Sequence, residues 1–233
     1  MAVQTEIYLN GKLNNLVFYT SGGQKLVRTM PERLNQTSNT QARSRNFGLA
    51  ATAGRILRSH LEGVLPFPKD KKMQSLFSGA ISRWLGLSDA ASLPPQTPEA
   101  LNGFSFNQKI AFGERCRIPF TISKQADELQ IALPELIPAG VFAAPVATQE
   151  VQLSFSLAGC GLLQAGFRNA AAKQLVIPYN DQLQPAQTVT LPAITEEGTL
   201  LVLVAAIRFM KEQGKPDTRE EFLPAAILWS AYY

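Results

Sequence analysis

Residues 16–30 constrain the fold most strongly, because they carry the pattern of a β-hairpin. Leu16–Thr20 and Lys25–Met30 are runs rich in β-branched, aromatic and other apolar residues, and the polar, glycine-containing segment 21–24 separates them. Two such runs joined by a short glycine-containing loop predict a hairpin. An isolated hairpin is at best marginally stable in water, so this one must pack on other structure. That structure is either its own chain or a neighbouring molecule.

A second turn signal lies upstream of this hairpin. Asn10-Gly11 stands between two short apolar runs, and this dipeptide favours a two-residue type I′ turn. We therefore expect the first thirty residues to form a three-stranded meander that turns at Asn10-Gly11. Asn14-Asn15 offers an alternative interruption of the same segment.

An amphipathic helix is predicted after the meander. Thr37, Ser38 or Asn39 is a suitable N-cap. The apolar positions share one arc at the helical period, whereas Arg55 and Arg58 lie on the far side. The apolar arc contains Ala42, Leu49, Ala50, Ala53, Ile56, Leu57, Leu61 and Val64.

A second amphipathic helix is predicted beyond the stiff corner 66–68. Asp70 is its N-cap and Gly86 its end. Its apolar residues recur at i, i+3, i+4 and i+7, which predicts packing against a core or another helix. They are Met73, Leu76, Phe77, Ala80, Ile81, Trp84 and Leu85.

The pattern changes to strands after a proline-containing linker. Val151–Leu157 alternates strictly between apolar and polar residues, as a half-buried strand does. Six or seven strands with regularly spaced turns predict an antiparallel β-sandwich of immunoglobulin-like type, without the Cys…Trp…Cys pattern of antibody domains. The predicted strands are 118–122, 129–133, 151–157, 175–179, 188–191, 200–210 and 226–233.

The predicted fold class is therefore α+β. An N-terminal β-hairpin or meander and a two-helix segment occupy residues 1–90, a linker occupies residues 91–106, and an antiparallel immunoglobulin-like β-sandwich occupies residues 107–233.

Short motifs are spread over the first ninety residues. They are Gly11-Lys12, Val17, Tyr19, Gly22-Gly23, Arg28 and Pro31, followed by Thr37, Gln41, Arg45, Phe47, Gly48, residues 65–68 and Lys72-Met73. The first part, G-K-x(4)-V-x-Y then G-x(4)-R-x-x-P, resembles an N-terminal signature of a group of uncharacterised bacterial proteins with a β-rich C-terminal half. The resemblance implies the same architecture and implies no activity.

Residues suited to catalysis or metal binding are few. His60 is the only histidine, and its helical position places it inside the apolar arc. Cys116 and Cys160 are the only cysteines, and we expect buried free thiols unless their Cα atoms lie within about 7 Å, as a disulfide requires. Neither a phosphate-binding nor a dinucleotide-binding glycine motif is present. We therefore predict no enzymatic activity, no metal site, no cofactor and no small-molecule substrate.

Charge is scarce and unevenly distributed. Charged residues make up 17% of the chain, well below the usual quarter. Residues 1–90 carry 12 Lys and Arg against 5 Asp and Glu, whereas residues 91–233 carry 10 against 13. A basic N-terminal part and a mildly acidic remainder would attract anionic partners, or would attract each other between neighbouring copies.

These features favour a structural, self-assembling homo-oligomer, such as a component of a filament, tube or particle. In this hypothesis the N-terminal hairpin of one copy extends a sheet edge of the next copy's sandwich. Such a head-to-tail contact generates rings or open filaments. The aromatic C-terminus indicates a tightly packed chain end or interface. The candidate assembly contacts are Tyr8, Phe18, Tyr19, Val27, Arg28, Trp229, Tyr232 and Tyr233.

Nucleic-acid binding is the alternative hypothesis. A basic hairpin followed by a basic helix can follow a phosphate backbone. The arginines do not share one helical face, however, and few aromatic residues are interleaved with them. The candidate contacts are Arg28, Arg33, Arg43, Arg45, Arg55, Arg58, Lys71 and Lys72.

The sequence predicts neither a secretory signal nor a membrane span. The N-terminal residues lack a basic segment followed by a continuous apolar run, and the longest apolar run, 200–207, is too short to cross a bilayer. We therefore expect a chain made as a cytoplasmic protein, with signal-independent export or release in a particle left open.

Overall fold

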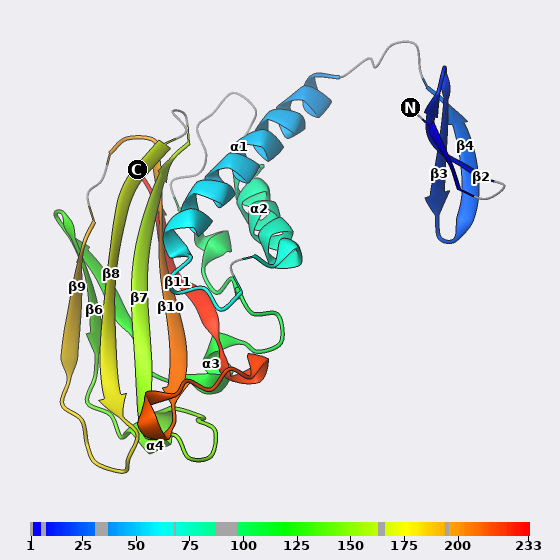
Figure 1. Cartoon of the computed structure of the whole chain (residues 1–233). Helices are drawn as coiled ribbons and strands as arrows, with labels where there is room; N and C mark the ends of the chain where they lie inside the picture. The colour runs from blue at the N-terminus through cyan, green and yellow to red at the C-terminus, as the bar shows by residue number, and fades with distance from the viewer. Residues whose placement is uncertain are drawn as a thin grey trace. The chain divides into compact units, whose positions relative to one another are not determined.

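The computed structural model of the 233-residue chain describes residues 2–5, 8–30, 37–67, 69–86, 97–162, 166–193 and 196–233. The chain divides into two compact units, residues 1–41 and 42–233. Both helices and antiparallel strands are present, which confirms the mixed class predicted from the sequence (Figure 1). The immunoglobulin-like assignment stays a prediction.

The N-terminal unit contains a four-stranded antiparallel sheet in the order β1-β2-β3-β4. The predicted hairpin is confirmed, with its turn at Gly22-Gly23. Their φ angles of +57° and +80° lie in the left-handed region that a type I′ turn requires at both central positions. The strands are β1 (Ala2–Thr5), β2 (Tyr8–Leu13), β3 (Leu16–Ser21) and β4 (Gln24–Thr29).

The predicted turn at Asn10-Gly11 is wrong. Both residues lie inside β2, where Asn10 pairs with Val3 and Gly11 with Ala2. The chain turns instead at Asn14-Asn15, with Asn14 at a φ of +50° that asparagine tolerates. The predicted three-stranded meander is therefore four-stranded, because pairing on both sides of β2 keeps the Asn-Gly dipeptide extended.

Helix α1 (Ser38–Leu61) begins directly after Thr37, which is one of the three predicted N-caps. The Thr37 hydroxyl accepts a hydrogen bond from the Thr40 amide at 3.2 Å. Helix α2 (Lys71–Leu85) begins after Asp70, whose carboxylate accepts from the Lys72 amide at 2.8 Å. The predicted apolar stripe of α2 is buried except at Leu76, which is 38% exposed because it lies at the margin of the stripe.

The C-terminal unit contains two antiparallel sheets, in the orders β11-β10-β7-β8 and β5-β6-β9. The strands are β5 (Thr121–Gln125), β6 (Glu128–Leu133), β7 (Glu150–Gly161), β8 (Gly166–Pro178), β9 (Gln187–Pro192), β10 (Thr199–Met210) and β11 (Ala225–Tyr232). Short helical turns connect them, namely η1 (Glu99–Leu101), α3 (Phe112–Arg115), α4 (Pro138–Val141), η2 (Glu212–Gly214) and η3 (Glu220–Phe222).

Strand β10 of the four-stranded sheet in this unit is buried on both faces. Alternate residues of β10, from Leu201 to Phe209, join the core against β5, β6 and β9. The intervening residues, from Leu200 to Ala206, join a second core against α1 and α2. Figure 1 shows the helices on one face of this sheet and β6 and β9 on the other. Strand β10 therefore has a nearly continuous apolar sequence, as strands covered on both faces do.

The helical pair thus packs on the sandwich. The ring of Trp84 on α2 lies edge-on to Tyr232 of β11, with 5.6 Å between the ring centroids. Leu57 and Leu61 of α1 are fully buried in the same core. The two compact units divide between Gln41 and Ala42, within the first turn of α1, so nearly all of α1 and all of α2 belong to the C-terminal unit.

Residues 97–106, from the predicted linker, form part of the C-terminal unit. Leu101 and Phe106 are buried in the core beneath α2. The Phe106 amide donates to the Ala225 carbonyl at 2.8 Å, and the Ile227 amide donates to the Phe104 carbonyl at 3.0 Å. This part of the predicted linker therefore extends the edge of β11.

Candidate assembly surfaces

The N-terminal sheet contains no buried side chain among residues 8–30. Phe18 is only half-buried, and Val27 is 54% exposed. A sheet becomes stable by packing an apolar face against another layer, and the described part of this unit supplies none. Its exposed large apolar residues are Tyr8, Leu9, Leu13, Tyr19, Leu26, Val27 and Met30.

The register of β2, β3 and β4 shows that both faces of this sheet are partly apolar. Directly paired residues share a face, so Phe18 lies beside Val27, and Tyr19 lies beside Leu26. The Arg28 guanidinium carbon lies 5.8 Å from the Tyr19 ring centroid, and the Lys25 ammonium lies 5.3 Å from that of Tyr8. One face carries Leu13, Leu16, Phe18 and Val27, and the other carries Val17, Tyr19, Leu26 and Arg28.

Strand β4 forms an edge of this sheet. Its two-residue turn is closed by the pair Ser21 and Gln24, and hydrogen-bonded pairs alternate along an antiparallel ladder. The Met30 amide donates to the Asn15 carbonyl at 2.6 Å, in phase with this alternation. Lys25, Val27 and Thr29 therefore direct their backbone N–H and C=O groups away from β3. These groups are the ones that another strand would bind.

The C-terminal candidate residues differ in exposure. Tyr232 is 8% exposed and packs on Trp84, so it is a core residue of its own chain. Trp229 is half-buried. Tyr233 is exposed, and the Lys124 ammonium lies 5.0 Å from its ring centroid. The predicted packing of this chain end therefore lies mostly inside the molecule, and Tyr232 has no surface to offer a second copy.

The candidate nucleic-acid contacts are divided between the two units. Arg28 belongs to the N-terminal unit, and Arg33 lies outside the described residues. On α1, Arg43 and Arg45 are exposed but point about 200° apart at the helical period. Arg58 is half-buried, and burial lowers the pKa of its guanidinium. The remaining exposed candidates are Arg55, Lys71 and Lys72.

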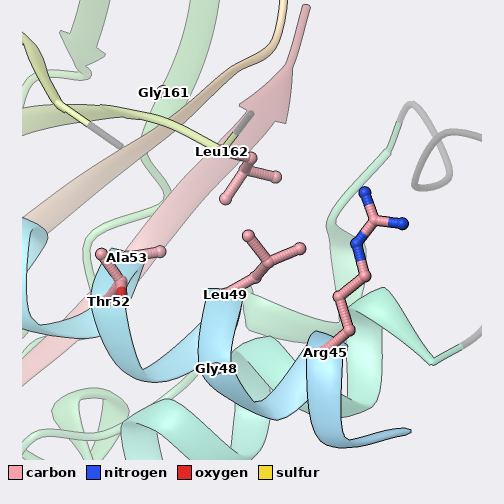
Figure 2. Close-up of a pocket in the computed structure, with 7 residues that line it drawn as sticks. All are labelled: Arg45, Gly48, Leu49, Thr52, Ala53, Gly161 and Leu162. Carbon is pink, nitrogen blue, oxygen red and sulfur yellow. The ribbon is translucent and has the colours of Figure 1, made fainter. Parts of the chain in front are cut away.

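A hollow of about 280 Å³ lies between α1 and the end of β7 (Figure 2). Its floor is apolar, with Leu49 and Leu162 facing each other, and Arg45 stands at its rim. Such a surface can hold a small apolar group beside a positive charge. Its described lining offers one hydroxyl and neither a histidine, a thiol nor a carboxylate, so no acid–base pair is formed there. The lining consists of Arg45, Gly48, Leu49, Thr52, Ala53, Gly161 and Leu162.

The two cysteine side chains are buried in the fold, and the histidine side chain lies beside a backbone carbonyl of its own helix. Cys116 and Cys160 are buried thiols that are not joined in a disulfide, and desolvation raises the pKa of the Cys116 thiol to about 12, which keeps it protonated. His60 Nδ1 lies 2.8 Å from the Ile56 carbonyl oxygen, one helical turn earlier. Within the described ranges, no three His, Cys, Asp or Glu side chains gather as metal ligands. No helix of these ranges is long and apolar enough to cross a membrane.

One ionic cluster was missed by the sequence analysis. The Asp217 carboxylate is 2% exposed and accepts hydrogen bonds from Arg219 at 2.7 Å and Lys211 at 2.8 Å. The hydrogen bonds from Arg219 hold the pKa of Asp217 well below its usual range. The guanidinium carbons of Arg219 and Arg115 lie 4.4 and 4.2 Å from the ring centroid of Phe222. The cluster fixes the loop between β10 and β11, and the spacing of Asp217 and Arg219 was the only signal for it.

No protein-family model, curated protein or solved structure matches this chain.

Proposed function

We propose that this is a non-enzymatic structural protein that joins copies of itself through its N-terminal sheet. The observation that carries the proposal is the absence of any buried side chain among residues 8–30, on a sheet with apolar residues on both faces. Contacts with another molecule would supply the apolar burial that such a sheet needs.

The mechanism that fits best is strand addition. The outward backbone groups of Lys25, Val27 and Thr29 would pair with a sheet edge of the next copy, while Phe18 and Val27 supply apolar contact. Donor and acceptor surfaces then differ, so the contact is heterologous and generates rings or filaments.

We also propose an immunoglobulin-like arrangement for the C-terminal unit. In support, the first, second and fifth strands of the unit share one sheet, and the third, sixth and seventh share the other. The fourth strand lies beside the third, in the position of the C′ strand of variable-type domains. Edge strands of such a sandwich are natural acceptors for strand addition.

The test is the size of the full-length protein over a concentration series, by light scattering and negative-stain electron microscopy. We expect the wild type to grow into regular rings or filaments and Val27→Asp to remain monomeric, because a charge would be buried in the contact. Val146→Asp is the matched control, since Val146 is 91% exposed on the C-terminal unit. A wild type that stays monomeric at every concentration would contradict the proposal.

Nucleic-acid binding is the second candidate, favoured by the exposed side chains of Arg43, Arg45 and Arg55 on α1. It predicts absorbance near 260 nm in the purified protein and binding that weakens steeply with salt. Arg45→Gln and Arg55→Gln would then reduce binding without changing the assembly.

A further inference from the structure

Strand addition requires an open acceptor edge, and of the four sheet edges in the C-terminal unit one is covered and two are short. The edge of β11 is covered by residues 103–106 of the same chain, where Gly103 donates to the Ile227 carbonyl at 2.8 Å. The edge strand β5 is only five residues long, and the Lys124 ammonium at its fourth position lies over the Tyr233 ring. Strand β9 has six residues. Strands as short as these offer few backbone groups to a partner strand.

Strand β8 is the remaining edge, and it is the longest one, with 13 residues (Figure 1). The Tyr179 amide donates to the Gln149 carbonyl at 2.7 Å, which sets the phase of the ladder between β7 and β8. By alternation, the N–H and C=O groups of every second β8 residue point away from β7. These outward residues are Ala170, Ala172, Gln174 and Val176, and all four are exposed.

The composition of β8 leaves this edge poorly protected. Strand β8 contains two charged residues, Arg168 and Lys173, and only Lys173 lies between residues 170 and 178. Val176 is 54% exposed, and it provides apolar surface beside the open backbone groups. A long, nearly uncharged edge with an exposed apolar side chain is a template for another strand.

The β4 edge matches this strand in its hydrogen-bonding pattern and in its exposed apolar side chain. Its outward residues Lys25, Val27 and Thr29 alternate with the same two-residue spacing, so three of them can pair with three outward residues of β8. Each edge also carries an exposed valine, Val27 on β4 and Val176 on β8, and each of these side chains is 54% exposed. Pairing of the two strands would remove part of this apolar surface from water.

We propose that β4 of one copy pairs with the β8 edge of a second copy, extending the sheet β11-β10-β7-β8 by the N-terminal sheet. This contact rests on the proposed function, since it names the acceptor of the same assembly. It places Val27 against the outward row that contains Ala172, Gln174 and Val176.

A charge substitution on the acceptor tests the contact. Gln174→Lys would place a cation on the face of the joined sheet that also carries Lys25, and we expect assembly to require about tenfold more protein, because like charges are costly in an interface. Gln174→Glu should assemble at least as well as the wild type. Gln187→Lys is the matched control, because it makes the same change at an exposed position of β9 and should have no effect.

Disulfide trapping locates the contact directly. Copies carrying Val27→Cys are mixed with differently tagged copies carrying Ala172→Cys, Gln174→Cys or Val176→Cys. Directly opposed residues of a hydrogen-bonded pair lie about 5.5 Å apart at Cα, within disulfide range. The native Cys116 and Cys160 are buried and give little background. We expect disulfides between tagged copies for at least one β8 position and none with Gln187→Cys.

The outcomes separate the acceptor from the assembly itself. Assembly by the wild type and not by Val27→Asp would support the proposed function. If Gln174→Lys then assembled as well as Gln187→Lys and the disulfides formed away from β8, β8 would not be the acceptor strand, and the proposed function would stand. A chain carrying both Val27→Cys and a β8 cysteine could instead form the disulfide within itself. If that intramolecular disulfide formed in dilute protein at the same yield as at high concentration, the contact would not be one between two copies. A wild type that never assembles removes both.

Discussion

The two four-stranded antiparallel sheets of this protein differ in how deeply their side chains are buried. The sheet β1-β2-β3-β4 has no buried side chain among residues 8–30, whereas β10 in the sheet β11-β10-β7-β8 is buried at every residue except Arg208. Both have antiparallel ladders, so backbone hydrogen bonding does not distinguish them. Burial of apolar surface does distinguish them. The sheet β11-β10-β7-β8 buries its apolar residues within its own unit, whereas the sheet β1-β2-β3-β4 needs contacts with other structure to bury its own.

The largest expected effect comes from emptying the core of the sheet β11-β10-β7-β8. Phe155 is fully buried and lies edge-on to Phe120, with 5.7 Å between the ring centroids. We expect Phe155→Ala to lower the free energy of unfolding by about 3–5 kcal/mol, because it removes apolar burial and leaves a cavity. Denaturant unfolding followed by tryptophan fluorescence measures this, since Trp84 and Trp229 both lie in the C-terminal unit.

Phe18→Ala is the counterpart in the N-terminal sheet. It should change that same unfolding free energy by less than about 0.5 kcal/mol while weakening assembly, because Phe18 has no fully buried site to lose. Equal destabilisation by Phe18→Ala and Phe155→Ala would show that the N-terminal sheet belongs to the cooperative core, and would end the contrast between the sheets.

A smaller, pH-dependent effect is expected at Asp217. Asp217→Asn removes the buried carboxylate from Arg219 and Lys211 and should cost about 1–3 kcal/mol at neutral pH, limited by the solvent exposure of both cations. The folded pKa of Asp217 lies below the ordinary value of about 3.9, so its stabilisation is complete above about pH 5 and is lost as the pH falls through the folded pKa.

Unfolding of the wild type and Asp217→Asn should therefore be compared at pH 7 and pH 3. The difference in unfolding free energy between them should shrink at the lower pH. A difference that is the same at both values would assign the effect to packing rather than to the charge.

The smallest effect is expected at matched glycines of the two units. Gly23 and Gly103 have φ angles of +80° and +81°, and an added Cβ would meet no atom within 4 Å at either position. Alanine should cost about 1 kcal/mol at each, through backbone strain alone. Gly23→Ala should raise the concentration needed for assembly, and Gly103→Ala should lower the unfolding free energy of the C-terminal unit. If Gly23→Ala instead lowered the unfolding free energy of the C-terminal unit, and Gly103→Ala instead raised the concentration needed for assembly, the contrast between the two sheets would be wrong.

The features that the sequence predicted correctly are local ones. The caps Thr37 and Asp70, the Gly22-Gly23 turn and the alternation of Val151–Leu157 depend on neighbours within a few residues, so their patterns carry the information. Asn10-Gly11 failed because pairing with β1 overrides the local turn preference.

Features set by distant contacts were not predicted. The attachment of α1 and α2 to the sheet, and the pairing of residues 103–106 with β11, join segments more than a hundred residues apart. The apolar run 200–207 was the available signal, because a strand covered on both faces needs apolar residues at every position. The candidate acceptor was only partly predicted, since Ala170–Gln174 lacks the β-branched and aromatic residues that mark a strand.

Residues 103–106 also determine how many neighbours each copy can have. By occupying the edge of β11, they leave one donor strand and one acceptor strand per chain in the proposed contact. A unit with one donor and one acceptor forms only unbranched, polar chains or closed rings. A copy with an impaired donor, such as Val27→Asp, would still bind one neighbour through β8 and then stop growth. Small amounts of it should therefore shorten wild-type filaments in proportion to the amount added.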